Sequence, residues 1–252
     1  MTLEIIIYSI IFLYGVVIGS FLNVCIYRIP KNEDLAKKRS HCMQCNYQLK
    51  WYDLVPLVSW ICLGGRCRKC KKSISVQYPL IELVNGIVYL LVFYVNGFTI
   101  TSVIFCLLAS ALLVLSVIDF RTYEIPLGIN LFILALGLIR LALDYQHWAT
   151  YIIGLFLVSS ILYSIVLLSK GKAMGGGDVK LMAACGLLLG WQQILLAFVL
   201  GCILGSVIHV IRIRVSKASH VLAMGPYLSA GVFLSALWGE QLITLYMQYL
   251  GI

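Results

Sequence analysis

The sequence predicts an all-α polytopic membrane protein with about eight transmembrane helices and a small cytoplasmic zinc-binding domain between the first and second helices. The composition is the first observation behind this prediction: 62% of the 252 residues are hydrophobic, 12% are charged and the mean hydropathy is +0.98. Most of such a chain must face lipid or pack within it. The other two observations are a series of long apolar runs and four paired cysteines in the one polar segment.

The first apolar run, residues 5–24, is long enough to span a bilayer. It lacks a basic n-region and a small-residue cleavage site, so we expect a retained helix rather than a signal peptide. Seven more runs follow, at residues 80–97, 99–118, 127–143, 149–169, 174–191, 192–211 and 221–238. Residues 181–191 alone are too short to cross at about 1.5 Å per residue. A start at Met174 gives roughly 27 Å and puts Asp178 about one turn inside the sixth helix.

The basic residues predict the orientation. With eight crossings, all but one of the 19 Lys and Arg residues fall on one side. Eleven lie within residues 28–72, and the others on that side are Arg121, Lys170, Lys172, Lys180, Arg212, Arg214 and Lys217. By the positive-inside rule that side is the cytoplasm. The net charge of +9 then reflects topology and contact with anionic lipid, and no nucleic-acid partner is required.

Three domains are expected: a first helix in residues 1–27, a cytoplasmic domain in 28–79 and a transmembrane domain in 80–252. The cytoplasmic piece is too short to bury much of a core, so it needs a metal, disulfides or neighbouring contacts. Its paired Cys-x2-Cys motifs can surround one zinc ion tetrahedrally, with Gly64-Gly65 forming a turn before the second motif. The four predicted ligands are Cys42, Cys45, Cys67 and Cys70.

Four thiolates leave no open position on zinc, which indicates a structural role. His41 and Cys62 remain alternative ligands, because the spacing between the two motifs slightly exceeds the usual range. The cysteines could also be ordinary reduced thiols, whereas disulfides are disfavoured on a reducing side of the membrane. The remaining cysteines lie in predicted spans, where cysteine commonly acts as a small hydrophobic residue, and they receive no role.

Two aspartates beside uncharged apolar spans are the strongest functional signal. A carboxylate near hydrocarbon depth costs several kcal/mol unless it has a partner or is neutralised. Asp119 closes the third span, although it could be an ordinary solvated charge beside Arg121. Asp178 follows three glycines, and the alternative is a structural pair with Lys180, yet residues two apart on a helix do not face each other. Two such carboxylates at one cytoplasmic edge indicate acid/base chemistry.

The glycine-preceded aspartate forms a Gly-x-Gly-Asp motif, and the earlier aspartate precedes Ile125-Pro126. In these features the chain resembles the GxGD-type aspartic membrane proteases, and within them the type IV prepilin peptidases. Further elements follow the order of that family: Gly19-Ser-Phe-Leu-Asn-Val24, Tyr27-Arg-Ile-Pro30, Ser40-His-Cys42, Pro56-Leu-Val-Ser-Trp60, Gly65-Arg-Cys67 and Tyr78-Pro-Leu-Ile-Glu82. The resemblance covers nearly the whole chain.

The resemblance implies a bifunctional enzyme with Asp119 and Asp178 as its catalytic pair. Such enzymes cleave the leader of prepilins and pseudopilins at the cytoplasmic face, and many then methylate the new N-terminus with S-adenosylmethionine. By resemblance Glu82 is the methylation-linked, cofactor-binding residue; the alternative is a carboxylate that caps the second span. No Gly-rich strand–turn–helix fingerprint for a nucleotide cofactor is visible.

The chain departs from the family pattern at Leu127 and at Met224-Gly225-Pro226, and neither element is expected to touch the aspartates. From the helix ends alone, Asp178 is expected to be the resting carboxylate and general base, with Asp119 as the protonated acid. A proton-coupled carrier or a non-catalytic scaffold are the competing function classes. The edge position of both aspartates disfavours the first, and the glycine-preceded Asp178 disfavours the second.

Overall fold

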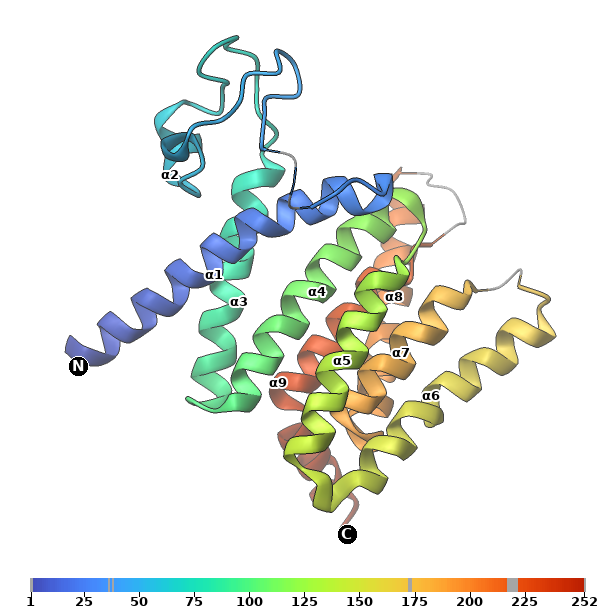
Figure 1. Cartoon of the computed structure of the whole chain (residues 1–252). Helices are drawn as coiled ribbons and strands as arrows, with labels where there is room; N and C mark the ends of the chain where they lie inside the picture. Colours follow the sequence, from blue (N-terminus) through green and yellow to red (C-terminus); the bar gives the residue numbers. More distant parts are fainter. Residues whose placement is uncertain (1, 36, 38, 172–173, 217–221, 252) are drawn as a thin grey trace. The chain divides into compact units, whose positions relative to one another are not determined.

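The structure is a computed structural model that describes residues 2–35, 37, 39–171, 174–216 and 222–251. Within these residues the chain is helical, and its β-structure is limited to two isolated bridges (Figure 1). It divides into two compact units, Met1–Phe98 and Thr99–Ile252. The domain ends expected after residues 27 and 79 both fall inside the first unit, so that unit combines two spans with the cysteine-rich segment.

The helices of the first unit are α1 (Thr2–Arg28), η1 (Ile29–Lys31), η2 (Trp51–Asp53), α2 (Val58–Cys62) and α3 (Gln77–Asn96). The helices of the second unit are α4 (Ile100–Thr122), α5 (Leu127–Leu143), η3 (Tyr145–His147), α6 (Trp148–Leu168), α7 (Gly176–Leu189), α8 (Trp191–Ser216) and α9 (Gly225–Leu250).

Each expected apolar run lies within or overlaps one of the eight long helices in the described part of the chain. Six of these, α1, α3, α4, α6, α8 and α9, are long and apolar enough to cross a membrane, so the chain is a multi-pass membrane protein. Helix α5 has 17 residues and α7 only 14, about 21 Å at 1.5 Å per residue. The expected count of eight full spans therefore rests on two helices that are shorter than the rest.

Three of the helices differ from their predicted bounds by several residues. Helix α7 begins at Gly176 rather than Met174 and ends at Leu189, because Gly190 adopts a φ of 85° that breaks the helix before α8 starts at Trp191. Helix α8 continues beyond the expected residue 211 to Ser216. The last helix was expected at 221–238; residue 221 lies outside the described residues, and α9 runs from Gly225 to Leu250.

In the first unit, α1 and α3 pack side by side through glycines. A Cβ on Gly15 would lie 2.9 Å from the Cα of Gly86, and one on Gly19 would lie 2.7 Å from the Cα of Glu82. The amide of Asn85 also donates to the Gly15 carbonyl at 2.7 Å. Small residues four apart let membrane helices approach closely, so this contact explains why the two spans form one unit with the segment between them.

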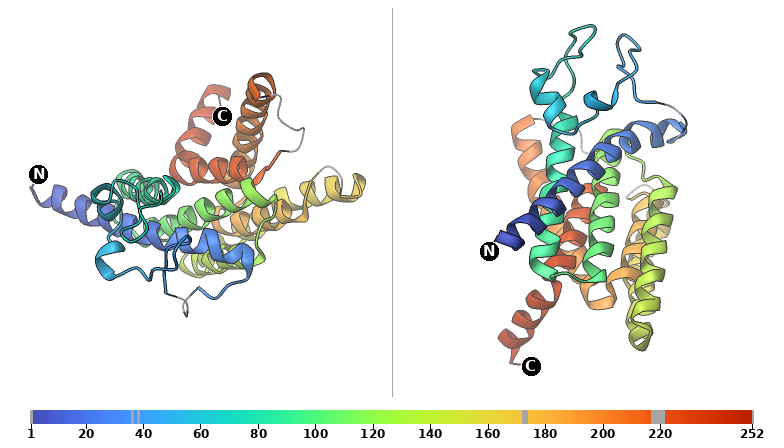
Figure 2. Two further views of the ribbon diagram at one scale, coloured as in Figure 1. Left: turned by 90° about the horizontal axis from the view of Figure 1, so that it is seen from above. Right: turned by 60° about the vertical axis from the view of Figure 1, so that its left-hand side comes forward.

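In the second unit, α7 is the most enclosed helix, and it packs against α5 and α6 (Figure 2). The side chains of Leu181, Met182 and Cys185 are fully buried. At Gly186 the backbone meets that of Gly154 in α6 so closely that neither position has room for a Cβ. The middle of α7 is therefore tightly packed against its neighbours. This packing fixes the position of the helix, including the first turn that contains Asp178.

Candidate active site

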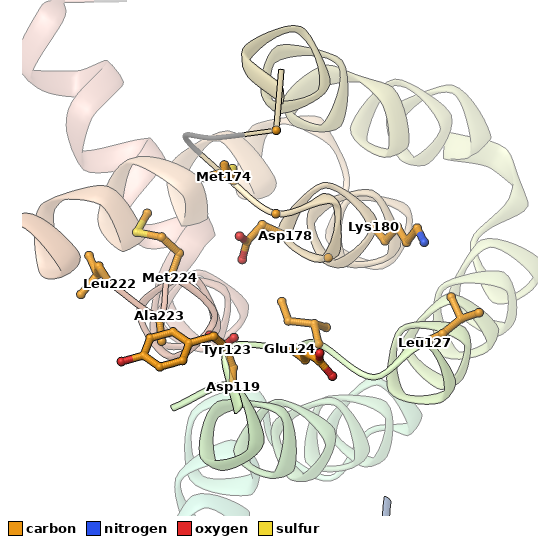
Figure 3. Close-up of a pocket in the computed structure, with 14 residues that line it drawn as sticks. Asp119, Tyr123, Glu124, Leu127, Met174, Asp178, Lys180, Leu222, Ala223 and Met224 are labelled. Atoms are coloured by element: carbon orange, nitrogen blue, oxygen red, sulfur yellow. The ribbon is translucent and has the colours of Figure 1, made fainter. Parts of the chain in front are cut away.

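A cavity of about 500 Å³ lies at the end of the second unit where α4 ends and α7 and α9 begin (Figure 3). Both predicted catalytic residues, Asp119 and Asp178, line it. The other lining residues are Tyr123, Glu124, Ile125, Leu127, Gly171, Met174, Gly175, Gly177, Lys180, Leu222, Ala223 and Met224. The structure thus brings together two carboxylates that are 59 residues apart in the sequence.

Asp119 lies in the last turn of α4 and is only 5% exposed, which rules out the alternative of an ordinary solvated charge. Its Oδ2 accepts a hydrogen bond of 2.9 Å from the backbone N–H of Gly225 at the start of α9. A Cβ on Gly225 would lie 2.6 Å from that oxygen. The expectation that the Met224-Gly225-Pro226 element would not touch the aspartates was therefore wrong: Gly225 is a contact residue that the sequence reasoning missed.

Asp178 is the third residue of α7 and is also buried. Its Oδ1 is inaccessible to solvent and has no hydrogen-bond partner among the described residues. Lys180 is exposed and points away from it in Figure 3, and no Asp178–Lys180 ion pair forms in the described part of the chain. The glycine before it packs tightly, because a Cβ on Gly177 would lie 3.0 Å from that of Ile125. Asp178 thus lines the cavity, while its Oδ1 is buried and has no partner within the part of the chain that the structure describes.

The carboxylates of both aspartates lie at helix N-termini in the folded chain, although Asp119 itself belongs to the last turn of α4. The sequence placed Asp119 at the negative end of α4, but its carboxylate also sits on the first N–H of α9, where a helix favours negative charge. Asp178 lies in the first turn of α7, and the two carboxylates interact electrostatically. Two like charges at one site resist simultaneous ionisation, so one member of such a pair tends to be protonated while the other is charged. The arrangement suits general acid/base chemistry on a bound group.

The first unit brings the four predicted metal ligands together. All four Sγ atoms, those of Cys42, Cys45, Cys67 and Cys70, lie within 4.8 Å of one another. The shortest separations are 3.9 Å between Cys42 and Cys70 and 4.0 Å between Cys45 and Cys67. Zinc–sulfur bonds of about 2.3 Å in a tetrahedron require sulfurs about 3.8 Å apart. The residues present therefore fit a zinc ion, and the alternative ligand Cys62 lies outside the cluster.

The two Cys-x2-Cys turns repeat one backbone pattern. The N–H of Cys42 donates to the carbonyl of Tyr47, and the N–H of Cys67 donates to that of Lys72, both at 2.9 Å. In each turn the residue after the second cysteine has a positive φ. Backbone hydrogen bonds, chiefly from Cys70, lower the pKa of the Cys67 thiol to about 6. The predicted Gly64-Gly65 turn is confirmed by φ values of 58° and 67°.

A buried carboxylate joins the two turns. Asp53 in η2 accepts hydrogen bonds from Arg68 Nε at 2.7 Å, the Lys50 N–H at 3.2 Å and the Tyr47 hydroxyl at 3.4 Å. Its side chain is 2% exposed, and Arg68 lies between the cysteines of the second motif. The sequence analysis did not identify this group, since nothing in the spacing of these residues indicates that they meet.

Glu82 is buried in α3, five residues after the helix begins, so it does not cap the helix. Its Oε2 accepts a 2.8 Å hydrogen bond from the backbone N–H of Leu57, and the Ser20 side chain also bonds to it. The alternative of a cap was wrong, because the carboxylate holds a loop rather than the helix end. The cavity that contains the two aspartates does not include Glu82.

The two regions together define a class: a membrane protein with a paired-carboxylate cavity and a four-cysteine cluster. Residues 13–96 match the family described as the Bacterial Peptidase A24 N-terminal domain, and residues 106–210 match the Type IV leader peptidase family. These ranges fall one in each compact unit. No solved structure matches the chain.

Similar curated proteins span nearly the whole chain. One from Stutzerimonas stutzeri, a prepilin leader peptidase/N-methyltransferase, is 31% identical and covers 93% of this chain and 92% of its own length. A protein of the same description from Pseudomonas aeruginosa is 31% identical, with 95% and 93% covered. Another from Klebsiella pneumoniae is 36% identical, with 74% and 86% covered. The chain belongs to the type IV leader peptidase family.

Proposed function

We propose that this chain is a membrane aspartic endopeptidase that removes the leader of prepilins and pseudopilins and then methylates the new N-terminus. The observation that carries the peptidase activity is the pair of buried carboxylates, Asp119 and Asp178, on one cavity. The substrate and the second activity are supported by the relatives named prepilin leader peptidase/N-methyltransferase.

In the proposed reaction the peptide carbonyl enters the cavity beside a water molecule. One carboxylate removes a proton from the water as it attacks, while the protonated partner gives its proton to the carbonyl oxygen. When the tetrahedral gem-diol intermediate collapses, the C–N bond breaks, the leaving amine takes a proton from one carboxyl group, and a hydroxyl of the intermediate returns its proton to the other carboxylate. Each turnover thus returns the pair to its starting state, with one proton shared between two carboxylates.

We assign the resting charge to Asp119 and the proton to Asp178, which reverses the roles expected from the sequence. The Asp119 carboxylate accepts a hydrogen bond from the Gly225 N–H and lies at the positive end of the α9 dipole. Both interactions stabilise a charged carboxylate. Asp178 has a buried Oδ1 without a partner among the described residues, and a buried oxygen that receives no hydrogen bond favours the neutral, protonated carboxyl group. Infrared difference spectra of isotopically labelled Asp119→Asn and Asp178→Asn variants test this. A protonated-carboxyl band that survives in Asp178→Asn and is lost in Asp119→Asn would restore the original roles.

Orientation toward the cytoplasm is proposed from charge. In the second unit the cavity end carries Arg121, Lys180, Arg212 and Arg214, whereas Arg140 lies at the other end, hydrogen-bonded to Thr101. Lys172 and Lys217, which the sequence placed on the same side, lie outside the described residues. Anionic membrane lipid and the positive-inside rule both favour this placement.

We propose zinc as the metal of the four-cysteine cluster, with Cys42, Cys45, Cys67 and Cys70 as ligands in a cytoplasmic domain of residues 28–79. Bound zinc would neutralise the thiolates and cross-link two turns of a segment that has little core of its own. The first helix, residues 1–27, and the peptidase domain, residues 80–252, complete the proposed domain organisation.

S-adenosylmethionine stays a proposal that rests on the relatives' names. Glu82 remains the residue that the resemblance links to methylation. Its carboxylate accepts a hydrogen bond from the Leu57 N–H, an interaction that holds a loop. We therefore derive no methyl-transfer step through it.

The decisive experiment is co-expression of the chain with a candidate prepilin, followed by mass measurement of the product N-terminus. Loss of the leader tests the peptidase, and an added methyl group tests the second activity separately. An intact leader with a well-inserted enzyme, across several prepilins, would contradict the proposal. A carrier would instead show ion or solute flux that depends on the aspartates.

A further inference from the structure

The loop that follows the first cysteine motif exposes large apolar side chains. We call the residues Trp51, Leu54, Val55, Val58 and Ile61 the apolar patch. Trp51 is 79% exposed and Ile61 is 68% exposed, so neither side chain is covered by the rest of its unit. Clusters of exposed apolar side chains in one short segment mark a contact surface.

The backbone contact between Leu57 and Glu82 gives the depth of this patch relative to α3. Glu82 lies five residues after the start of α3 at Gln77, about 7.5 Å along the helix axis. Because the N–H of Leu57 reaches the Glu82 carboxylate at 2.8 Å, the loop descends beside the first turns of an apolar span. On that same stretch of α3, Leu80 and Leu83 are themselves exposed. Leu57, which lies between Val55 and Val58 of the apolar patch, is thus level with side chains that a membrane would cover.

The loop is fixed in this position rather than loosely placed. Leu57 has a φ of 59° and a ψ of −54°, and the Val58 N–H bonds to the Pro56 carbonyl across it, which makes a tight γ-turn. A non-glycine residue in this conformation is strained and persists only where its surroundings hold it. The buried Glu82 carboxylate supplies that hold. Val58 and Ile61 follow this turn in α2, and their side chains are exposed. The hydrogen bond between Leu57 and Glu82 therefore fixes the start of the helix that carries them.

The charge around the patch suits a lipid surface. Residues 28–72 contain eleven Lys and Arg residues against three acidic ones, Glu33, Asp34 and Asp53. Basic residues beside a membrane span attract anionic headgroups, and tryptophan prefers the interface between headgroups and acyl chains. An apolar patch with Trp51 at one end and this basic excess around it has the composition of an interfacial anchor.

We propose that the apolar patch inserts into the lipid leaflet beside α3, so that the cysteine-rich segment is docked on the membrane surface through residues 51–61. The proposal is independent of the peptidase activity. It commits to lipid as the occupant. Water, the second unit of the chain and a protein substrate are the alternatives that the experiment must separate.

The test uses the native tryptophans of the full chain in lipid nanodiscs. One variant keeps Trp51 and changes the other four tryptophans to Phe. A matched variant keeps only Trp60, whose indole N–H bonds to the Ile74 carbonyl and whose ring packs on Gly65 in the same domain. We expect lipids brominated near the headgroup end to quench Trp51 by at least about twofold, and to quench Trp60 much less. Lipids brominated near the terminal methyl should quench Trp51 weakly.

Two further outcomes would overturn the proposal. Trp51 quenched by aqueous iodide but not by brominated lipid would place the patch in water, and resistance to both quenchers would place it under protein. In the Trp51-only background, Ile61→Asp should reduce the lipid quenching by about half, whereas Ile61→Leu should leave it unchanged. Both substitutions change an exposed side chain, and a normal gel-filtration profile shows that the fold survives. Equal quenching in the Asp and Leu variants would also count against insertion.

Discussion

Asp53 and Asp178 are both buried carboxylates, but their surroundings are opposite. Asp53 receives three donors, from Arg68, Lys50 and Tyr47, while one oxygen of Asp178 has no partner among the described residues. Buried polar groups are normally satisfied, and a satisfied network stiffens a fold. An unsatisfied one needs another explanation, and here a cavity adjoins it. The difference separates a carboxylate that links the parts of a small domain from one that lines a cavity with its hydrogen bonds incomplete within the described residues.

The largest expected effect is on activity. Asp119→Asn and Asp178→Asn should each lower leader cleavage by about 10²–10⁴-fold, because each removes one member of the acid/base pair. Membrane insertion and protein yield should stay normal. Product mass after co-expression with a prepilin measures the change. Asp144→Asn at the opposite end of the second unit, where Asp144 binds His147 and Tyr151, is the matched control and should cleave normally. Substantial cleavage by either dyad variant would remove that residue from the catalytic pair.

The second prediction concerns the cysteine-rich segment and is independent of the active site. Replacing Cys45 or Cys70 with Ser should abolish stoichiometric zinc and open residues 28–76 to proteases, because metal binding in so small a piece supplies folding free energy on the order of 10 kcal/mol. Elemental analysis and limited proteolysis report the two effects. Cys62→Ser, an exposed cysteine of the same segment outside the cluster, should change neither. Zinc retained by the ligand variants would refute the cluster as the site.

The contact of Gly225 with Asp119 gives a smaller and more local effect. Gly225→Ala should lower cleavage by about 10–100-fold, since its Cβ would lie 2.6 Å from Asp119 Oδ2 and must displace the carboxylate. Gly176→Ala is the control, because a Cβ there would meet nothing within 4 Å. Equal kinetics for the two alanine variants would show that the Gly225 contact does not position Asp119.

The smallest effect concerns Asp53. Burial raises the pKa of its carboxyl, but the hydrogen bonds from Arg68 and the Lys50 N–H outweigh burial and lower the pKa below its usual range. The lowered folded-state pKa means that Asp53 stabilises the fold above the unfolded pKa of about 3.9, and that this stability is lost as the pH falls through the folded value. Asp53→Asn should cost about 1–3 kcal/mol at neutral pH, with a smaller difference from the native chain in acid.

The measurement for Asp53 is the denaturant midpoint for proteolysis of residues 28–76 at neutral and acidic pH, which isolates the cysteine-rich segment. Asp34→Asn is the matched control, because Asp34 pairs with the largely exposed Lys37 at 3.8 Å. Its effect should stay below about 0.5 kcal/mol. A pH-independent loss in the Asp53 variant would show that packing, rather than charge, explains its role.

Local pattern predicted most of this architecture. Apolar runs located each long helix, because a membrane span must satisfy its own backbone and so leaves a continuous signal. The Cys-x2-Cys spacing identified the four clustered cysteines, since two such turns present their thiols to a common centre. The glycine-preceded Asp178 and the span-closing Asp119 were selected because a carboxylate is costly at that depth.

Contacts between distant backbone atoms escaped prediction. The N–H of Gly225 meets Asp119 across 106 residues, and that of Leu57 meets Glu82 across 25. Every residue except proline has a backbone N–H, so the amino-acid sequence does not show which N–H will meet a distant carboxylate. The end of the sixth helix was predicted two residues late, at Trp191, whereas the positive φ of Gly190 ends α7 at Leu189.

The two similar cysteine turns indicate how a metal ion would bind to the cluster and leave it. Each turn closes through its own backbone hydrogen bonds. Each can therefore offer its two thiolates as a bidentate ligand without the other turn in place. Loading can then proceed in two steps, with one turn capturing the ion and the second closing over it. Release must reverse that order, and an ion freed by one turn stays within reach of the other, whose local concentration favours recapture. The cluster should therefore exchange its metal slowly even where its equilibrium affinity is ordinary.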